Sequence, residues 1–127
     1  MKIRFALSAA AAGLVIFAAG CGENPDDVAK NWYSAILNGD LKKADLCVID
    51  TAEARRSNEL CAEKIGECRQ RSAVDPAAKA ALQQVERAKF SKPEVVGDRA
   101  TVTIAADGSV RLLLQKIGGK WKIADIK

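Results

Sequence analysis

The chain has 127 residues, with 20 Lys and Arg, 16 Asp and Glu, four Cys and no His. This length accommodates one domain and leaves no room for a second complete core. The lack of His excludes Ser-His-Asp and Cys-His nucleophilic arrangements and removes the commonest zinc ligand. A charged fraction of 28% beside a hydrophobic fraction of 49% is typical of a globular chain rather than a disordered one.

Residues 1–20 have the pattern of a secretory signal peptide. Lys2 and Arg4 form a short basic region, and the run from Phe5 to Ala19 carries no charge. That run is shorter than the roughly 20 apolar residues that a membrane span needs, but it suits the central region of an export signal. We therefore expect residues 1–20 to be removed and the rest of the chain to act outside the cytoplasm.

The segment Ala18-Ala19-Gly20-Cys21 resembles a bacterial lipobox, in which the Cys thiol is lipidated and becomes the first residue of the mature chain. The departure is Ala18, which stands where Leu is usual. The resemblance implies a lipid anchor on Cys21, a tether over residues 21–24 and a cell-envelope location facing the periplasm or extracytoplasmic space. The alternative is an ordinary Ala-x-Ala signal cleaved nearby, which would leave Cys21 as a thiol.

Three cysteines, Cys47, Cys61 and Cys68, remain in the expected domain, and export would place them where disulfides form. On one straight helix Cys61 and Cys68 would be roughly 10 Å apart, whereas a disulfide needs Cα atoms within about 7 Å. We predict a Cys47–Cys61 bridge, with Cys47–Cys68 as the alternative. No metal site or cofactor is predicted, because three Cys without His or a CxxC pair lack zinc spacing.

Helices are predicted first. Asn24-Pro25-Asp26-Asp27 is a helix start, and the apolar residues that follow recur at helical spacing until Gly39. Asp40 is predicted to cap a second helix, the charged stretch 51–72 to form a third, and Asp75-Pro76 to open a fourth that ends near Gln84.

Beyond residue 85 the apolar spacing changes to period two. Alternating runs around Val102, Leu112 and Trp121 are separated by Gly97-Asp98, Asp107-Gly108 and Gly118-Gly119, which are hairpin signals. With a strand over about 86–96, these runs predict a four-stranded antiparallel meander. Pro93 requires the first strand to be an edge or to carry a bulge. The fold class is therefore α+β, with N-terminal helices on one face of a curved sheet, over residues 25–127.

Three segments in order, Pro-Asp-Asp-Val-Ala-Lys-Asn-Trp, Val-Val-Gly-Asp-Arg-Ala-Thr-Val-Thr-Ile and Gly-Gly-Lys-Trp-Lys-Ile, resemble small bacterial lipoproteins of the cystatin-like, nuclear-transport-factor-2-like superfamily. The resemblance implies a sheet curved around the first long helix to form a cone. Residues expected to line a pocket in such a cone are Trp32, Tyr33, Ile36, Leu112, Leu114, Trp121, Ile123 and Asp125.

The function predicted from these features is a non-catalytic one. Enzymes of this superfamily place an Asp or His base and a Tyr or acid donor in the cone, whereas here His is absent and Tyr33 and Asp125 are the nearest candidates. We expect a lipid-anchored envelope domain that binds a small apolar ligand or an envelope protein. The alternatives are a structural lipoprotein with a filled interior and an isomerase-type or dehydratase-type enzyme. Without residues 1–20 the net charge is only +2, which argues against nucleic acid as a partner.

Overall fold

The protein is described by a computed structural model that covers residues 21–106 and 108–127; the predicted signal peptide lies outside the described residues. Four helices come first: α2 (Pro25–Asn38), α3 (Leu41–Cys47), α4 (Ala52–Ser72) and α5 (Pro76–Glu86). Five strands follow: β2 (Lys89–Phe90), β3 (Glu94–Val96), β4 (Arg99–Ala106), β5 (Gly108–Ile117) and β6 (Lys120–Ile126). The predicted α+β class and its order of elements are confirmed.

All strands belong to one antiparallel sheet with the order β2-β4-β5-β6, and β3 also pairs with β4. The predicted first strand is thus two short strands along one edge. The break falls at Lys92–Pro93, since Pro has no N–H to donate to the ladder. Ser91 keeps the edge attached, because its N–H donates to the Thr103 carbonyl and its hydroxyl accepts from the Thr103 N–H.

Capping residues mark the helix ends described below, with one exception at the start of α2. Gly39 ends α2 with a left-handed φ of 71°, which a residue with a side chain rarely adopts. The side chains of Asp40, Thr51 and Asp75 accept backbone N–H bonds at the starts of α3, α4 and α5. Asn24 precedes α2 as predicted, but its side chain makes no capping bond and instead donates to Asp27.

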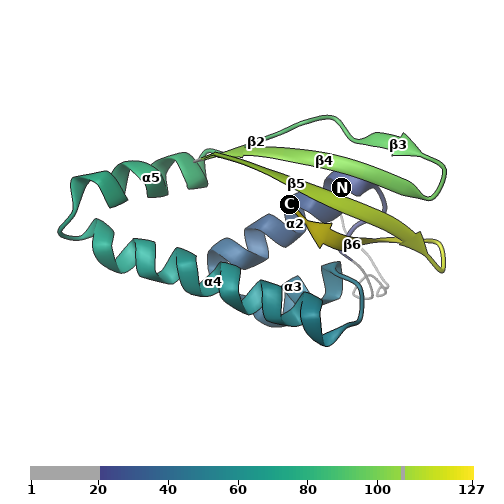
Figure 1. Cartoon of the computed structure of the whole chain (residues 1–127), viewed down its shortest axis with the longest axis horizontal. Helices are drawn as coiled ribbons and strands as arrows, with labels where there is room; N and C mark the ends of the chain where they lie inside the picture. Colours follow the sequence, from purple (N-terminus) through teal and green to yellow (C-terminus); the bar gives the residue numbers. More distant parts are fainter. Residues whose placement is uncertain (1–20, 107) are drawn as a thin grey trace, which may run out of the picture.

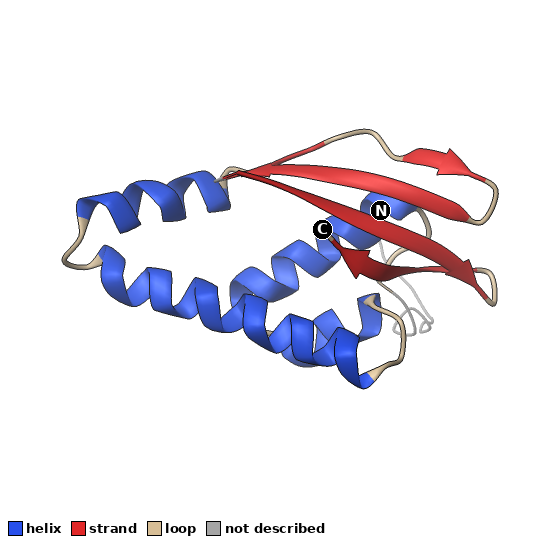
Figure 2. Cartoon of the chain, in the orientation of Figure 1, coloured by secondary structure: helices blue, strands red, loops and turns tan. Residues whose placement is uncertain are grey.

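α2 lies across one face of the sheet and α3 meets it at β6, whereas α5 and part of α4 extend past the strands; the opposite face is uncovered (Figures 1 and 2). Alternate residues of the strands project toward the helices and are buried: Ala100, Val102, Ile104, Leu112, Leu114, Trp121 and Ile123. They meet the buried stripe of α2, which consists of Val28, Ala29, Trp32, Ala35 and Ile36. Val48 bridges Ile123, and the Ile49 N–H donates to the Ile123 carbonyl, so the segment after α3 is joined to β6.

One irregularity interrupts β6. Leu114 pairs with Ile123 while Leu113 pairs with Asp125, so that Ala124 is an extra residue in the ladder. Such a bulge shifts the alternation of side chains by one position. Residues 121 and 123 therefore face the helices, whereas Asp125 lies opposite Leu113 on the uncovered face.

α4 and α5 lie side by side, and their connecting turn lies at the opposite end of the molecule from the β3–β4 and β5–β6 turns (Figure 1). The molecule thus has a helical end at residues 73–75 and a sheet end at residues 97–98 and 118–119. Among the described helices, none is both long enough and apolar enough to span a bilayer.

Candidate functional site

The predicted lipid attachment residue, Cys21, lies inside the protein. Its side chain is 5% exposed and is bonded to Cys47, with the two Cα atoms 5.1 Å apart. The turn at Gly39–Asp40 folds α3 back along α2, which brings the end of α3 to the start of the described chain. The predicted Cys47–Cys61 pair is therefore wrong in this structure, and so is the alternative Cys47–Cys68 pair.

The two remaining cysteines are free and partly buried. Cys61 packs against the core from α4, and burial raises the pKa of its thiol, an effect that nearby Lys64 only partly opposes. The Cys68 thiol faces α5 and donates to the Ala78 carbonyl at 3.5 Å. Both thus face neighbouring parts of the fold from α4, and neither is the partner of Cys47.

Two features hold the chain at Cys21 against α2. The Asn31 side-chain amide donates to the Cys21 carbonyl. Gly22 has a φ of 138°, and a Cβ built on it would lie 2.6 Å from the Cβ of Asp27. Only glycine lets the backbone come this close to α2 and turn Cys21 inward. The geometry places the Cys21 sulfur in a buried site where a thioether-linked lipid has no space.

All the residues predicted to line a pocket except Asp125 are brought together in the core. Trp32, Ile36, Leu112, Leu114, Trp121 and Ile123 belong to one core cluster, and each is at most 7% exposed. Tyr33 packs on the edge of this cluster.

The cavities that the described residues do line lie nearer the surface. One of about 370 Å³ lies between β6 and the start of α4, and its lining includes Val48, Thr51, Glu53, Ile123 and Asp125. Two others lie at the α5–β4 junction and over the outer face around Leu113, where Leu114 and Asp125 contribute. None of these three is lined by Trp32, Tyr33, Ile36 or Trp121.

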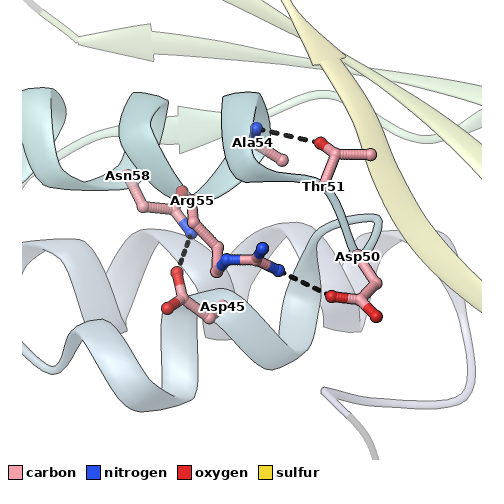
Figure 3. Close-up of polar contacts among 6 residues, drawn as sticks. All are labelled: Asp45, Asp50, Thr51, Ala54, Arg55 and Asn58. Carbon is pink, nitrogen blue, oxygen red and sulfur yellow. Dashed lines mark hydrogen bonds and ion pairs between the residues drawn. The ribbon is translucent and has the colours of Figure 1, made fainter.

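A buried polar chain connects α2, α3 and α4. The Trp32 indole N–H donates to the Asn58 Oδ1 atom at 2.8 Å. The Asn58 amide in turn donates to the Asp45 carboxylate at 2.9 Å (Figure 3). In the same view Thr51 caps α4 and Arg55 pairs with Asp50. Asn58 is fully buried and was missed in the sequence because its neighbours are charged.

A signal for Asn58 was present. It precedes Cys61 by three positions and Ile65 by seven, so it occupies the stripe of α4 that faces the core. A polar residue in such a stripe is expected to find a hydrogen-bond partner, and here the partner is Trp32.

Tyr33 and Asp125, the two candidate catalytic residues, do not share a site. The Tyr33 hydroxyl donates to the Val85 carbonyl at 2.6 Å, and its ring packs edge-on against Phe90. Burial raises the pKa of this phenol. Asp125 was expected to share the inward parity of Trp121 and Ile123; the bulge at Ala124 makes that expectation wrong. Its carboxylate is exposed, accepts from the Ile126 N–H and lies 4.0 Å from the Lys127 amine.

Trp121 and the lysines around it form the sheet end of the core. Trp121 is buried, and the Lys116 amine lies 5.8 Å from the centre of its ring. The Lys122 amine donates to the Leu46 carbonyl, and burial, followed by the charge of Lys120, lowers the pKa of Lys122. Within the described residues no group of three or more Cys, Asp or Glu side chains is placed to hold a metal ion.

No family model, no curated protein and no solved structure matches this chain. The resemblance to cystatin-like lipoproteins therefore stays a prediction from the three quoted segments.

Proposed function

We propose that the protein is a lipid-anchored component of the cell envelope that acts by surface contact with another envelope molecule and not by catalysis. The observation that favours surface contact is the burial of Trp32, Leu114 and Trp121, which pack with other apolar side chains in one core cluster. The separation of Tyr33 from Asp125 favours a non-catalytic role, because these groups face different parts of the molecule.

A lipid anchor requires Cys21 to leave its buried site, and the free energies of burial and of membrane insertion permit this. Withdrawal removes the burial of one small side chain and the hydrogen bond from Asn31, together about 2–3 kcal/mol. Each CH₂ of an acyl chain buried in a bilayer contributes about 0.8 kcal/mol, so about four CH₂ groups offset that loss. A lipidated Cys21 would then extend with residues 22–24 toward the membrane and leave the Cys47 thiol free.

A second candidate is favoured by the Cys21–Cys47 pair itself. One sulfur cannot be both acylated and in a disulfide, so a protein cleaved by an ordinary signal peptidase would keep the bridge and be an unanchored exported domain. The two candidates share the domain and differ in the state of Cys21.

Metabolic labelling with a radioactive fatty acid separates these candidates. Wild type and Cys47→Ala are expected to incorporate label, and Cys21→Ala is expected to incorporate none. Cys47→Ala is the matched control because it removes the same bridge while leaving the acylation site intact. Label that persists in Cys21→Ala would refute the anchor. Wild type that stays unlabelled and keeps a Cys21–Cys47 bridge would establish the second candidate.

A further inference from the structure

We infer that the sheet end of the domain rests on anionic lipid head groups of the membrane that holds the anchor. The sheet-end surface consists of residues 92–99 and 115–122, which include the β3–β4 and β5–β6 turns. This inference rests on the proposed anchor at Cys21 and adds which surface faces the bilayer and which lipid class it meets.

Apolar side chains are exposed at this end. Val95, Val96 and Ile117 have exposed fractions of 52%, 81% and 50%, and they are three of the six large hydrophobic side chains exposed in the described residues. Val96 pairs with Arg99, which pairs with Gln115, and Ile117 lies two residues beyond Gln115. Val96 and Ile117 thus flank the Gly97–Asp98 turn, where apolar tips can enter the interfacial layer of a bilayer.

The charge of the same surface is basic. Its two segments contain Lys92, Arg99, Lys116 and Lys120, besides Lys122, whose amine is bonded to the Leu46 carbonyl, but only two acidic residues, Glu94 and Asp98. Arg99 and Lys116 are exposed. Basic residues beside exposed apolar ones are the pattern that binds anionic lipid, with about 1 kcal/mol from each Lys or Arg near a charged bilayer. A neutral membrane would not supply this attraction.

The direction of α2 brings the anchor to this end. Tyr33, in the second half of α2, contacts Phe90, which pairs with Ile104 at the end of β4 remote from the Gly97–Asp98 turn. The start of α2 therefore points toward the sheet end, as its position in Figure 1 also shows. Residues 22–24 can span only about 10 Å when extended, so the domain cannot stand away from the bilayer.

A lipid cross-linking experiment tests the inference on the native, lipidated protein. The protein is reconstituted in vesicles of phosphatidylcholine with phosphatidylglycerol that carries a photoreactive group on its head, and cross-linked peptides are mapped by mass spectrometry. We expect cross-links in segments 92–99 and 115–122 that weaken with added salt, and few at residues 72–76 of the α4–α5 turn. Equal labelling at both ends would overturn the inference.

Charge substitutions at the two ends of the molecule provide a test variant and its matched control. Val96→Asp with Ile117→Asp is expected to reduce sheet-end cross-linking severalfold. Val74→Asp changes a side chain that is 86% exposed at the opposite end of the molecule. This variant is expected to leave sheet-end cross-linking unchanged. Undiminished labelling in the double variant would overturn the inference. Protein that fails to enter the vesicles at all contradicts the anchor instead. Cross-links to a co-purified protein at the sheet end, with none to lipid, would assign the surface to a protein partner and also overturn it.

Discussion

Asn58 is the one polar side chain that the described part of the fold buries completely, and it decides how α2, α3 and α4 pack. Its carbonyl oxygen satisfies the Trp32 indole, and its amide reaches the Asp45 carboxylate. A buried donor left without a partner costs about 1–3 kcal/mol, so this residue specifies one arrangement of the three helices.

Asn58→Ala is expected to lower the free energy of unfolding by about 2–3 kcal/mol, because it leaves the Trp32 N–H unpaired and opens a small cavity. Urea unfolding followed by Trp fluorescence measures this change. Asn38→Ala is the control, since Asn38 is exposed at the end of α2 and its loss is expected to cost less than about 0.5 kcal/mol. Equal losses in the two variants would contradict a specific role for Asn58.

Tyr33 gives the stability a dependence on alkaline pH. Burial raises the pKa of Tyr33 above the ordinary value of 10.0, so the unfolded chain loses its phenol proton at lower pH than the folded chain does. The contribution of this group is complete below pH 10 and is lost as pH rises through the folded pKa.

Tyr33→Phe removes this titration and the bond to Val85, and Tyr33 is the only Tyr in the chain. We expect the variant to be about 1 kcal/mol less stable at pH 7 and the difference from wild type to shrink above pH 10. Denaturant titrations of both proteins at pH 7 and pH 10.5 measure this difference in the free energy of unfolding. A difference in stability between the two proteins that grows with pH would contradict the loss of stability expected from the raised pKa of Tyr33.

Among the residues, sequence patterns identified capping positions and core apolar residues, because these depend on local spacing. Asp40 and Gly39 have the predicted roles. The Cys21–Cys47 contact was not predictable in the same way, because it depends on how α3 folds back along α2.

At the scale of elements, the bulge at Ala124 separates a buried half of β6 from its exposed end. In a regular ladder the pair after Leu114–Ile123 would be Leu113–Ala124, whereas Leu113 here pairs with Asp125. Strict alternation predicts the facing of Trp121 and Ile123 correctly and that of Asp125 incorrectly, since the sequence carries no Gly or other bulge signal at residue 124.

Deletion of Ala124 is therefore expected to give a regular strand that keeps Ile126 opposite Leu112 and retains cooperative thermal unfolding. Deletion of Thr103 is the matched control, because Thr103 lies in a regular part of β4 opposite Arg111. A one-residue shift there moves inward side chains to the outer face, so cooperative unfolding should be lost. Near-ultraviolet circular dichroism on heating distinguishes the two. Loss of cooperativity in both variants would contradict this account of the bulge.

The whole molecule joins one buried core to two different ends. The sequence predicted the order of helices and strands, because hydrophobic periodicity and turn residues act locally. It left open whether the interior holds a pocket or is filled, because that depends on how Trp32 and Trp121 pack from elements far apart in the chain. The function proposed for the molecule therefore depends on its surface and on Cys21, the expected first residue of the mature chain.

The state of Cys21 tests that function most directly. The protein is extracted from its own membranes without reductant, free thiols are alkylated, and the N-terminal peptide is weighed by mass spectrometry. The account predicts a peptide that begins at Cys21 and carries a thioether-linked diacylglyceryl group, with Cys47 alkylated. A peptide in which unmodified Cys21 is joined to Cys47, or one that still begins at Met1, would contradict it.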